Sequence, residues 1–136
     1  VVCQRRQIGC LRFCYVPRTS ITAQRYRCEP ERSIERAVTT VRRQAMATTA
    51  LPAAIANATR STTERVQPEF TTRRYGLPAY AQLSLDCARE LRTGADNGAE
   101  MGVFNMLMQP QREANLRLRF EEYLPFGLEA GLIFVG

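Results

Sequence analysis

The chain has 136 residues with 45% hydrophobic and 24% charged side chains, which suits one small domain. Its net charge is +6, all 19 of its positive side chains are arginine, and histidine, lysine and tryptophan are absent. These absences exclude histidine-dependent catalysis, zinc sites with imidazole ligands, Schiff bases and P-loop lysines. An enzyme site would have to be built from carboxylates, cysteine, tyrosine or arginine. Taking the whole sequence together, we expect no enzyme and predict no catalytic residue, cofactor or metal.

The N-terminal segment, residues 1–30, is predicted to be β-structure. Side chains of two different kinds alternate along Leu11–Val16, and this period of two is typical of a strand. We expect strands over Val1–Ile8 and Leu11–Val16, with a bulge or a corner at Gly9 between them. Residues 18–28 are polar and basic, and we expect them to form an extended loop.

The middle segment, residues 31–65, is expected to contain one clear helix. Pro30 can begin it, and apolar residues recur at i, i+4 and i+7 from Ile34, which predicts a helix over 30–46. Residues 47–65 are rich in alanine and threonine, and they predict either a loosely packed helix or a linker.

The C-terminal segment, residues 66–136, is predicted to be mainly helical. Residues 66–78 are expected to be extended chain followed by a turn. Apolar residues on one stripe predict a helix over 79–92 that ends at a threonine–glycine pair, and a second helix is expected over 111–124. A short strand at 132–135 would end the chain.

The predicted class is α+β: short N-terminal strands, which are the end of a β-helix or a small sheet, followed by about three α-helices and irregular loops. Glu113 and Arg117 are expected to form an i,i+4 ion pair in the favoured order. In an assembly module, the large side chains expected to act as anchors are Phe13, Tyr15, Tyr75, Tyr80, Phe104, Leu116, Phe120 and Tyr123.

The loop at 94–102 has the composition of a binding site. Asp96, Asn97 and Glu100 lie within five residues of one another, among glycines that allow close backbone approach. Calcium binds such oxygens, but here they do not recur at the alternate positions of a calcium loop. Asp and Asn also favour turns, and Glu can support the start of a helix. We therefore predict a structural loop rather than a metal site or an acid–base pair.

The positive charge is concentrated in the first third of the chain. Residues 1–45 hold ten arginines against three glutamates, a net charge of +7, whereas residues 46–136 carry −1. This segment could attract nucleic acid or another polyanion, or its arginines could pair with carboxylates of a protein partner. The predicted partner-binding residues are Arg5, Arg6, Arg12, Arg25, Arg27, Arg73, Arg74, Tyr75 and Arg112.

The five cysteines are odd in number and lack the C-x-x-C spacing of zinc sites. Strand spacing would place Cys10 and Cys14 about 13 Å apart, too far for a disulfide or a shared metal. We expect reduced thiols that pack as small apolar side chains, in the cytoplasm or in a particle assembled there. No apolar run is long enough to span a membrane.

Several long stretches resemble one protein family. They are Arg5–Pro17 (RRQIGCLRFCYVP), Arg25–Pro30 (RYRCEP), Phe70–Leu83 (FTTRRYGLPAYAQL), Gly94–Gly102 (GADNGAEMG), Gln109–Leu116 (QPQREANL) and Glu122–Gly131 (EYLPFGLEAG). They are similar to the C-terminal region of large, mostly uncharacterised bacterial proteins in which a right-handed β-helix precedes this region. Some of those proteins are encoded near genes for phage-tail-like contractile particles. Leu77 departs from the pattern, because the family more often has an acidic residue there.

The resemblance implies a structural role and brings no catalytic residue. A β-helix ends in an open strand edge that must be covered. Residues 1–30 would continue or cap such a β-helix, and the helices would dock on other protein subunits of a large multimeric assembly. The chain itself is expected to be part of a longer protein. The alternative is a nucleic-acid or polyanion-binding module that uses the arginine-rich residues 1–45.

Overall fold

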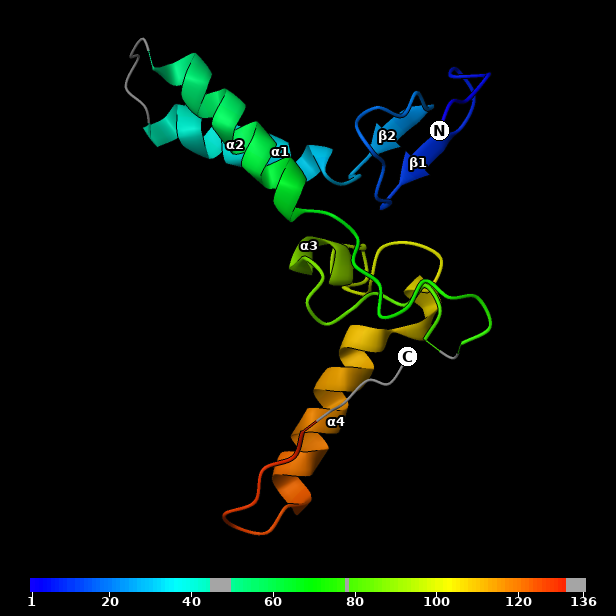
Figure 1. Ribbon diagram of the computed structural model, residues 1–136, viewed down its shortest axis with the longest axis vertical. Helices are drawn as coiled ribbons and strands as arrows, with labels where there is room; N and C mark the ends of the chain where they lie inside the picture. The colour runs from blue at the N-terminus through cyan, green and yellow to red at the C-terminus, as the bar shows by residue number, and fades with distance from the viewer. Residues whose placement is uncertain (45–49, 78, 132–136) are drawn as a thin grey trace.

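The computed structural model describes residues 1–44, 50–77 and 79–131, and it confirms the α+β class. Two short parallel strands come first and helices joined by irregular loops follow (Figure 1). The strand expected at 132–135 lies outside the described residues. In the described part of the chain, no helix is long and apolar enough to cross a membrane.

The two strands, β1 (Cys10–Arg12) and β2 (Gln24–Tyr26), pair in parallel. The strand predicted over Val1–Ile8 is wrong, because this segment makes only an isolated bridge, and its Val and Ile side chains are exposed. The loop predicted over 18–28 is also corrected, since it supplies β2.

Residues 10–16 and 24–30 form two stacked turns of chain that lie side by side at a constant offset of fourteen residues. The register pairs are Cys10 with Gln24, Leu11 with Arg25, Arg12 with Tyr26, and, as an isolated bridge, Tyr15 with Glu29. Parallel strands are most often joined through a helix. Here the connection between β1 and β2 contains no helix, and it brings the chain back so that β2 lies beside β1 in the same direction.

Both stacked turns bend at the same corner. Phe13 and Arg27 occupy equivalent positions and both have a φ of 49°, a left-handed conformation that is uncommon for residues other than glycine. Phe13 N donates to Tyr26 O (3.2 Å), and Glu29 N donates to Cys14 O (3.0 Å), so the pairing continues around the corner. This bend is why the strand predicted to extend to residue 16 ends at Arg12.

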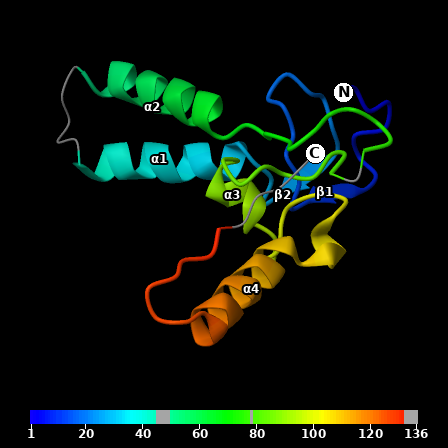
Figure 2. The same cartoon turned by 60° about the horizontal axis from the view of Figure 1, so that its bottom comes forward.

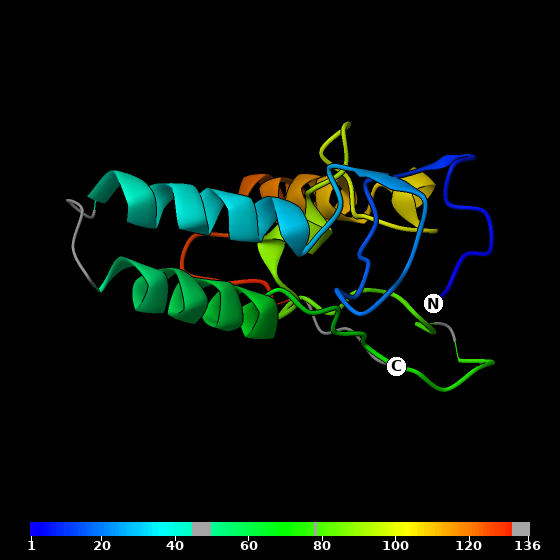
Figure 3. The same ribbon diagram turned by 90° about the horizontal axis from the view of Figure 1, so that it is seen from above.

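The middle segment is a pair of antiparallel helices, α1 (Glu31–Gln44) and α2 (Leu51–Arg65), which lie side by side (Figures 1 and 3). The helix predicted over 30–46 is confirmed within the described residues. Of the two possibilities for 47–65, the helix is correct, and it begins with Pro52 in its first turn. The two helices pack against each other, and their contacts, mostly through half-buried side chains, compensate for the weak helix propensity of the threonine-rich α2.

The C-terminal segment contains less helix than its apolar stripe predicts. Its helices are α3 (Arg89–Arg92), the 3-10 turn η1 (Asn105–Leu107) and α4 (Gln109–Tyr123). The helix predicted over 79–92 is wrong except for its last turn. Residue Ala81 has a φ of 58°, and bridges tie Leu83 to Phe70 and Tyr80 to Thr72, so the segment winds back on the chain before it.

The core is a small cluster under these loops. It consists of Val66, Cys87, Leu91 and Met101, with Tyr15 and Leu83 packed against it. The predicted stripe consists of Tyr80, Leu83, Cys87 and Leu91. It identifies Leu83, Cys87 and Leu91 correctly as core or core-packed residues, but Tyr80 is exposed and most of the segment is not helical. Tyr15 connects the stacked turns to this core.

Helix α4 projects away from the rest of the chain (Figures 1 and 2). It has no buried residue, and no other described helix or strand packs along it. Its large apolar side chains Leu116, Leu118 and Tyr123 are 41%, 57% and 83% exposed.

Candidate functional site

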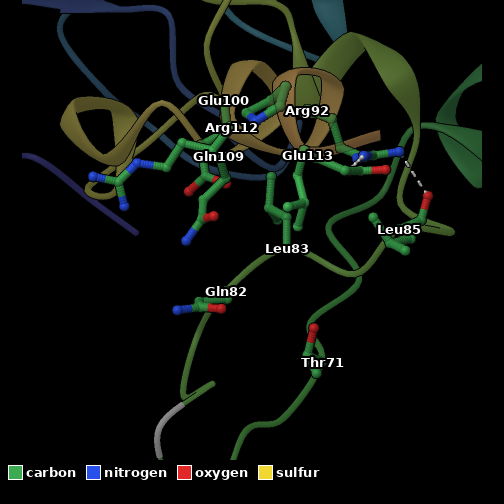
Figure 4. A pocket seen from close by; sticks show the side chains of 11 residues that line it. Thr71, Gln82, Leu83, Leu85, Arg92, Glu100, Gln109, Arg112 and Glu113 are labelled. Carbon is green, nitrogen blue, oxygen red and sulfur yellow. Dashed lines mark hydrogen bonds and ion pairs between the residues drawn. The ribbon is translucent and has the colours of Figure 1, made fainter. Parts of the chain in front are cut away.

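A small cavity of about 150 Å³ lies where the base of α4 meets the loops around the core. Its lining residues are Thr71, Gln82, Leu83, Leu85, Arg92, Glu100, Gln109, Pro110, Arg112, Glu113 and Leu116. Figure 4 shows Arg92, Glu100 and Glu113 towards one end, with Thr71 and Gln82 towards the other. The space is of the order of a benzene-sized apolar cavity, but its walls mix leucines with charged groups.

Glu100 is a buried carboxyl that lines this cavity. The residue is 5% exposed, and its carboxylate has no hydrogen-bond or ion-pair partner among the described residues. Burial raises the pKa of Glu100, and the nearby Arg92 guanidinium partly opposes that rise. Ionising a carboxyl that is largely enclosed and has no hydrogen-bond partner among the described residues is energetically costly, which makes this cavity a candidate site.

Arg92 does not neutralise Glu100, because its guanidinium is occupied elsewhere. Its Nη1 donates to Leu85 O (2.9 Å) and its Nη2 to Glu113 Oε2 (2.8 Å). The other oxygen of Glu113 pairs with Arg117 at 2.8 Å, which confirms the predicted i,i+4 ion pair. This network fixes the base of α4 to α3 and leaves the Glu100 carboxyl facing the cavity.

We expect Glu100→Gln to raise the free energy of unfolding at neutral pH by about 1 kcal/mol, since a neutral amide avoids ionisation in a buried place. The folded-state pKa of Glu100 is raised, so the wild-type chain loses stability as pH rises above the unfolded value of about 4.3. The gain from the variant should therefore shrink in acid. Urea unfolding at neutral and acidic pH measures it.

Glu113→Gln is the matched control for that prediction. Its carboxylate holds Arg92 and Arg117, so the same change there should lower stability at neutral pH. Equal effects of the two variants would contradict the account of Glu100.

The loop at 94–102 is irregular, as predicted, and Asn97 organises it. Asn97 Oδ1 accepts from Ala99 N (3.1 Å) in a local turn and from Asn105 Nδ2 (3.2 Å). Asp96 is exposed and pairs with Arg27 at 3.5 Å. The side chains of Asp96, Asn97 and Glu100 therefore have different surroundings and do not share one binding site. The described residues contain no cluster of three metal-ligating groups.

Some of the predicted partner-binding residues gather on the outside of the stacked turns. The Arg12 guanidinium lies 4.8 Å and that of Arg27 5.4 Å from the centre of the Tyr26 ring, and Phe13 meets Tyr26 edge to face at 5.9 Å. Arg12, Tyr26 and Arg27 are exposed. They form an arginine–aromatic patch on the stacked turns.

The other predicted partner-binding residues are dispersed. Arg25 is largely enclosed, and its guanidinium bonds Glu31 and the carbonyl of Ser20. Arg73 lies over the Phe70 ring, and Arg112 lines the cavity. Arg5, Arg6 and Arg74 are exposed and make no side-chain hydrogen bond or ion pair among the described residues, and the exposed Tyr75 meets Tyr80 edge to face at 5.3 Å.

A cleft of about 440 Å³ is absent from the sequence-based predictions. It lies between α1, the end of α2, and α3, and its charged lining residues are Glu29, Arg32, Arg36, Arg65, Arg89 and Glu90. Arg65 donates twice to the Glu90 carboxylate, at 3.0 and 2.6 Å, and holds the pKa of that carboxyl below its usual range. No sequence signal brings these residues together, because they come from three distant segments.

No family model, no curated protein and no solved structure matches this chain.

Proposed function

We propose that this chain is a structural module of a large bacterial assembly, of a phage-tail-like or contractile-injection type, which caps or continues a β-helix and docks on other protein subunits. The observation that carries the proposal is the pair of stacked turns, residues 10–16 and 24–30, with their constant parallel offset and their shared corner. A coil that returns beside itself in parallel is the repeating unit of a β-helix.

The open edge of β1 supports continuation of the stack. Among the described residues β1 pairs only with β2, so its other edge has no strand partner. Such an edge is a template for another strand. A further turn in the same parallel register would pair with this edge without changing β1 or β2.

The opposite end of the stack supports a capping role. The second turn leads directly into α1, and the buried Glu29 carboxylate accepts from Ser33 N (3.1 Å) in the first turns of that helix. Tyr15 packs against the core cluster. Helices and core therefore follow the last turn instead of another strand.

Helix α4 supports docking on a protein partner. Its exposed apolar residues continue past its end to Phe126, which is fully exposed. Apolar surface of this kind on a projecting helix is typical of interaction sites. We propose that α4 contacts other subunits of a multimer that is assembled in the cytoplasm.

The test is a chimera in which the full chain is joined to a right-handed β-helix protein whose own C-terminal cap has been removed. We expect the chimera to be monodisperse and to unfold cooperatively, whereas the uncapped β-helix aggregates through its open edge. Light scattering and thermal unfolding followed by circular dichroism measure both properties.

Two proline variants control the chimera. Phe13→Pro should abolish capping, because proline fixes φ near −65° whereas Phe13 has a φ of 49°. Ala130→Pro changes an exposed residue outside every helix and strand and should leave capping intact. The proposal fails if the chimera aggregates like the uncapped β-helix, or if Phe13→Pro caps as well as the parent.

The second candidate is polyanion binding by the first third of the chain, and the arginine–aromatic patch favours it. Single-strand binders combine positive charge with aromatic platforms of this kind. Binding of single-stranded DNA that weakens steeply with salt and is lost in Arg12→Gln, but not in Arg119→Gln on α4, would support this candidate over docking on protein.

A further inference from the structure

Two cysteines occupy the same position in the two stacked turns. The offset of fourteen residues that relates Tyr15 to Glu29 also places Cys14 opposite Cys28, one residue after the shared corner. Residues directly opposite in neighbouring strands have Cα atoms about 4.8 Å apart, within the range of about 4.4–6.8 Å that disulfides require. The register therefore brings these two backbones to disulfide distance.

The two thiols lie against the same short strand. Cys14 Sγ is 3.1 Å from the carbonyl oxygen of Arg12, and Cys28 Sγ is 3.4 Å from that of Leu11. The Cys28 side chain thus reaches across from its own turn to the strand that leads to Cys14. Both are free thiols in the structure.

The remaining cysteines have no cysteine opposite them in register, although Cys10 Sγ is also 3.5 Å from the carbonyl oxygen of Leu11. Cys10 is opposite Gln24, Cys87 lies in the core cluster, and Cys3 is outside the two stacked turns. Among the described residues, Cys14 and Cys28 are the one pair of cysteines in register.

The two thiols differ in their access to solvent. Cys14 is half-buried and lines an open hollow of about 620 Å³, which Arg12 and Asp96 also line. Cys28 is only 3% exposed. A small reagent can therefore reach Cys14 first, and Cys28 only after it.

We propose that Cys14 and Cys28 are a redox-active dithiol that closes to a disulfide across the stacked turns when it meets a low-molecular-weight disulfide such as glutathione disulfide. The Cys14 thiolate attacks one sulfur of glutathione disulfide and releases one glutathione. Cys28 then attacks Cys14 Sγ in the mixed disulfide and releases the second glutathione. The two protein thiols are oxidised, glutathione disulfide is reduced, and their two protons pass to the two glutathiones.

The pH dependence follows from the environment of Cys14. Burial raises the pKa of the Cys14 thiol, and the neighbouring Cys28 adds to the rise. Because the thiolate is the attacking species, the reaction should be slow at neutral pH and should accelerate as pH rises.

The experiment exposes the folded full chain to glutathione disulfide, blocks the remaining thiols with iodoacetamide, and maps tryptic peptides by mass spectrometry. Trypsin places Cys14 in the peptide 13–18 and Cys28 in the peptide 28–32, so their disulfide links two separate peptides. We expect this linked pair as the main product, with the mass of two hydrogens lost. The same treatment in denaturant should lose the selectivity.

Three serine variants separate the roles. Cys28→Ser should leave Cys14 as a stable mixed disulfide with glutathione, Cys14→Ser should leave Cys28 reduced, and Cys10→Ser should form the pair as the parent does. Circular dichroism checks that each variant is folded. The peptide map of the parent chain tests the proposal even if a variant fails to fold. The proposal is overturned if the main product joins Cys14 to Cys10 or to a second chain. It is also overturned if Cys14 and Cys28 stay reduced at alkaline pH while Cys10 reacts.

Discussion

Gly94→Ala is expected to lower the free energy of unfolding by about 3 kcal/mol, at the upper end of the usual cost of overpacking. A Cβ at Gly94 would lie 1.9 Å from the carbonyl oxygen of Glu90 and 2.6 Å from Cε of Met101. The first contact is with backbone that belongs to α3, so it cannot be relieved by rotating a side chain. Urea unfolding of both proteins measures the difference.

Gly131→Ala is the matched control for Gly94→Ala. A Cβ at Gly131 meets nothing within 4 Å, so this change should alter stability by less than about 0.5 kcal/mol. Equal stability of the Gly94→Ala variant and the parent would show that the chain at the end of α3 runs differently.

Leu91→Ala is expected to lower the free energy of unfolding by about 2–5 kcal/mol. Leu91 is 1% exposed at the centre of the core cluster, and few other large side chains are available to fill the space that it would leave. Because Tyr15 packs on that cluster, amide hydrogen exchange in the first stacked turn, residues 10–16, should also accelerate.

Leu118→Ala removes the same atoms from an exposed position. Leu118 is 57% exposed on α4, so its replacement should change stability by less than about 0.5 kcal/mol. A loss in Leu118→Ala as large as that in Leu91→Ala would mean that α4 is covered in solution.

Helices with local signals could be predicted from the sequence. The helix expected over 30–46 and α1 agree within the described residues, since a proline, an acidic first turn and a helical apolar spacing all lie within one segment. For α4 the expected start at residue 111 was two residues late. These signals act between neighbours in sequence, which is why they suffice.

The β-structure could not be predicted in the same way. β2 is polar and mostly exposed, so it lacks the alternation that marks a strand with one buried face. β2 forms because it pairs with β1, and that pairing joins residues fourteen apart in the sequence. Residues 79–92 show the reverse case. Leu83, Cys87 and Leu91 of the predicted stripe do pack in or on the core, but Tyr80 is exposed and most of the backbone is not helical.

The site was only partly visible in the sequence. Glu100 stood out as part of an acidic loop, but its burial and its lack of a partner depend on Arg92 being held by Glu113 on α4. Likewise Cys14 and Cys28 look unrelated along the chain, and only the register of the stacked turns makes them neighbours.

Where residues 10–16 and 24–30 coincide, they describe a screw in which one revolution uses fourteen residues and advances by about 4.8 Å, whereas the isolated bridge between Val2 and Ile21 joins residues nineteen apart. The rise along the axis is then about 0.34 Å per residue, against about 1.5 Å in an α-helix. Each added residue therefore lengthens such a coil much less than it lengthens an α-helix. Inserting or deleting a whole revolution changes only that length. Any other number of residues rotates everything that follows and removes every side chain from its counterpart.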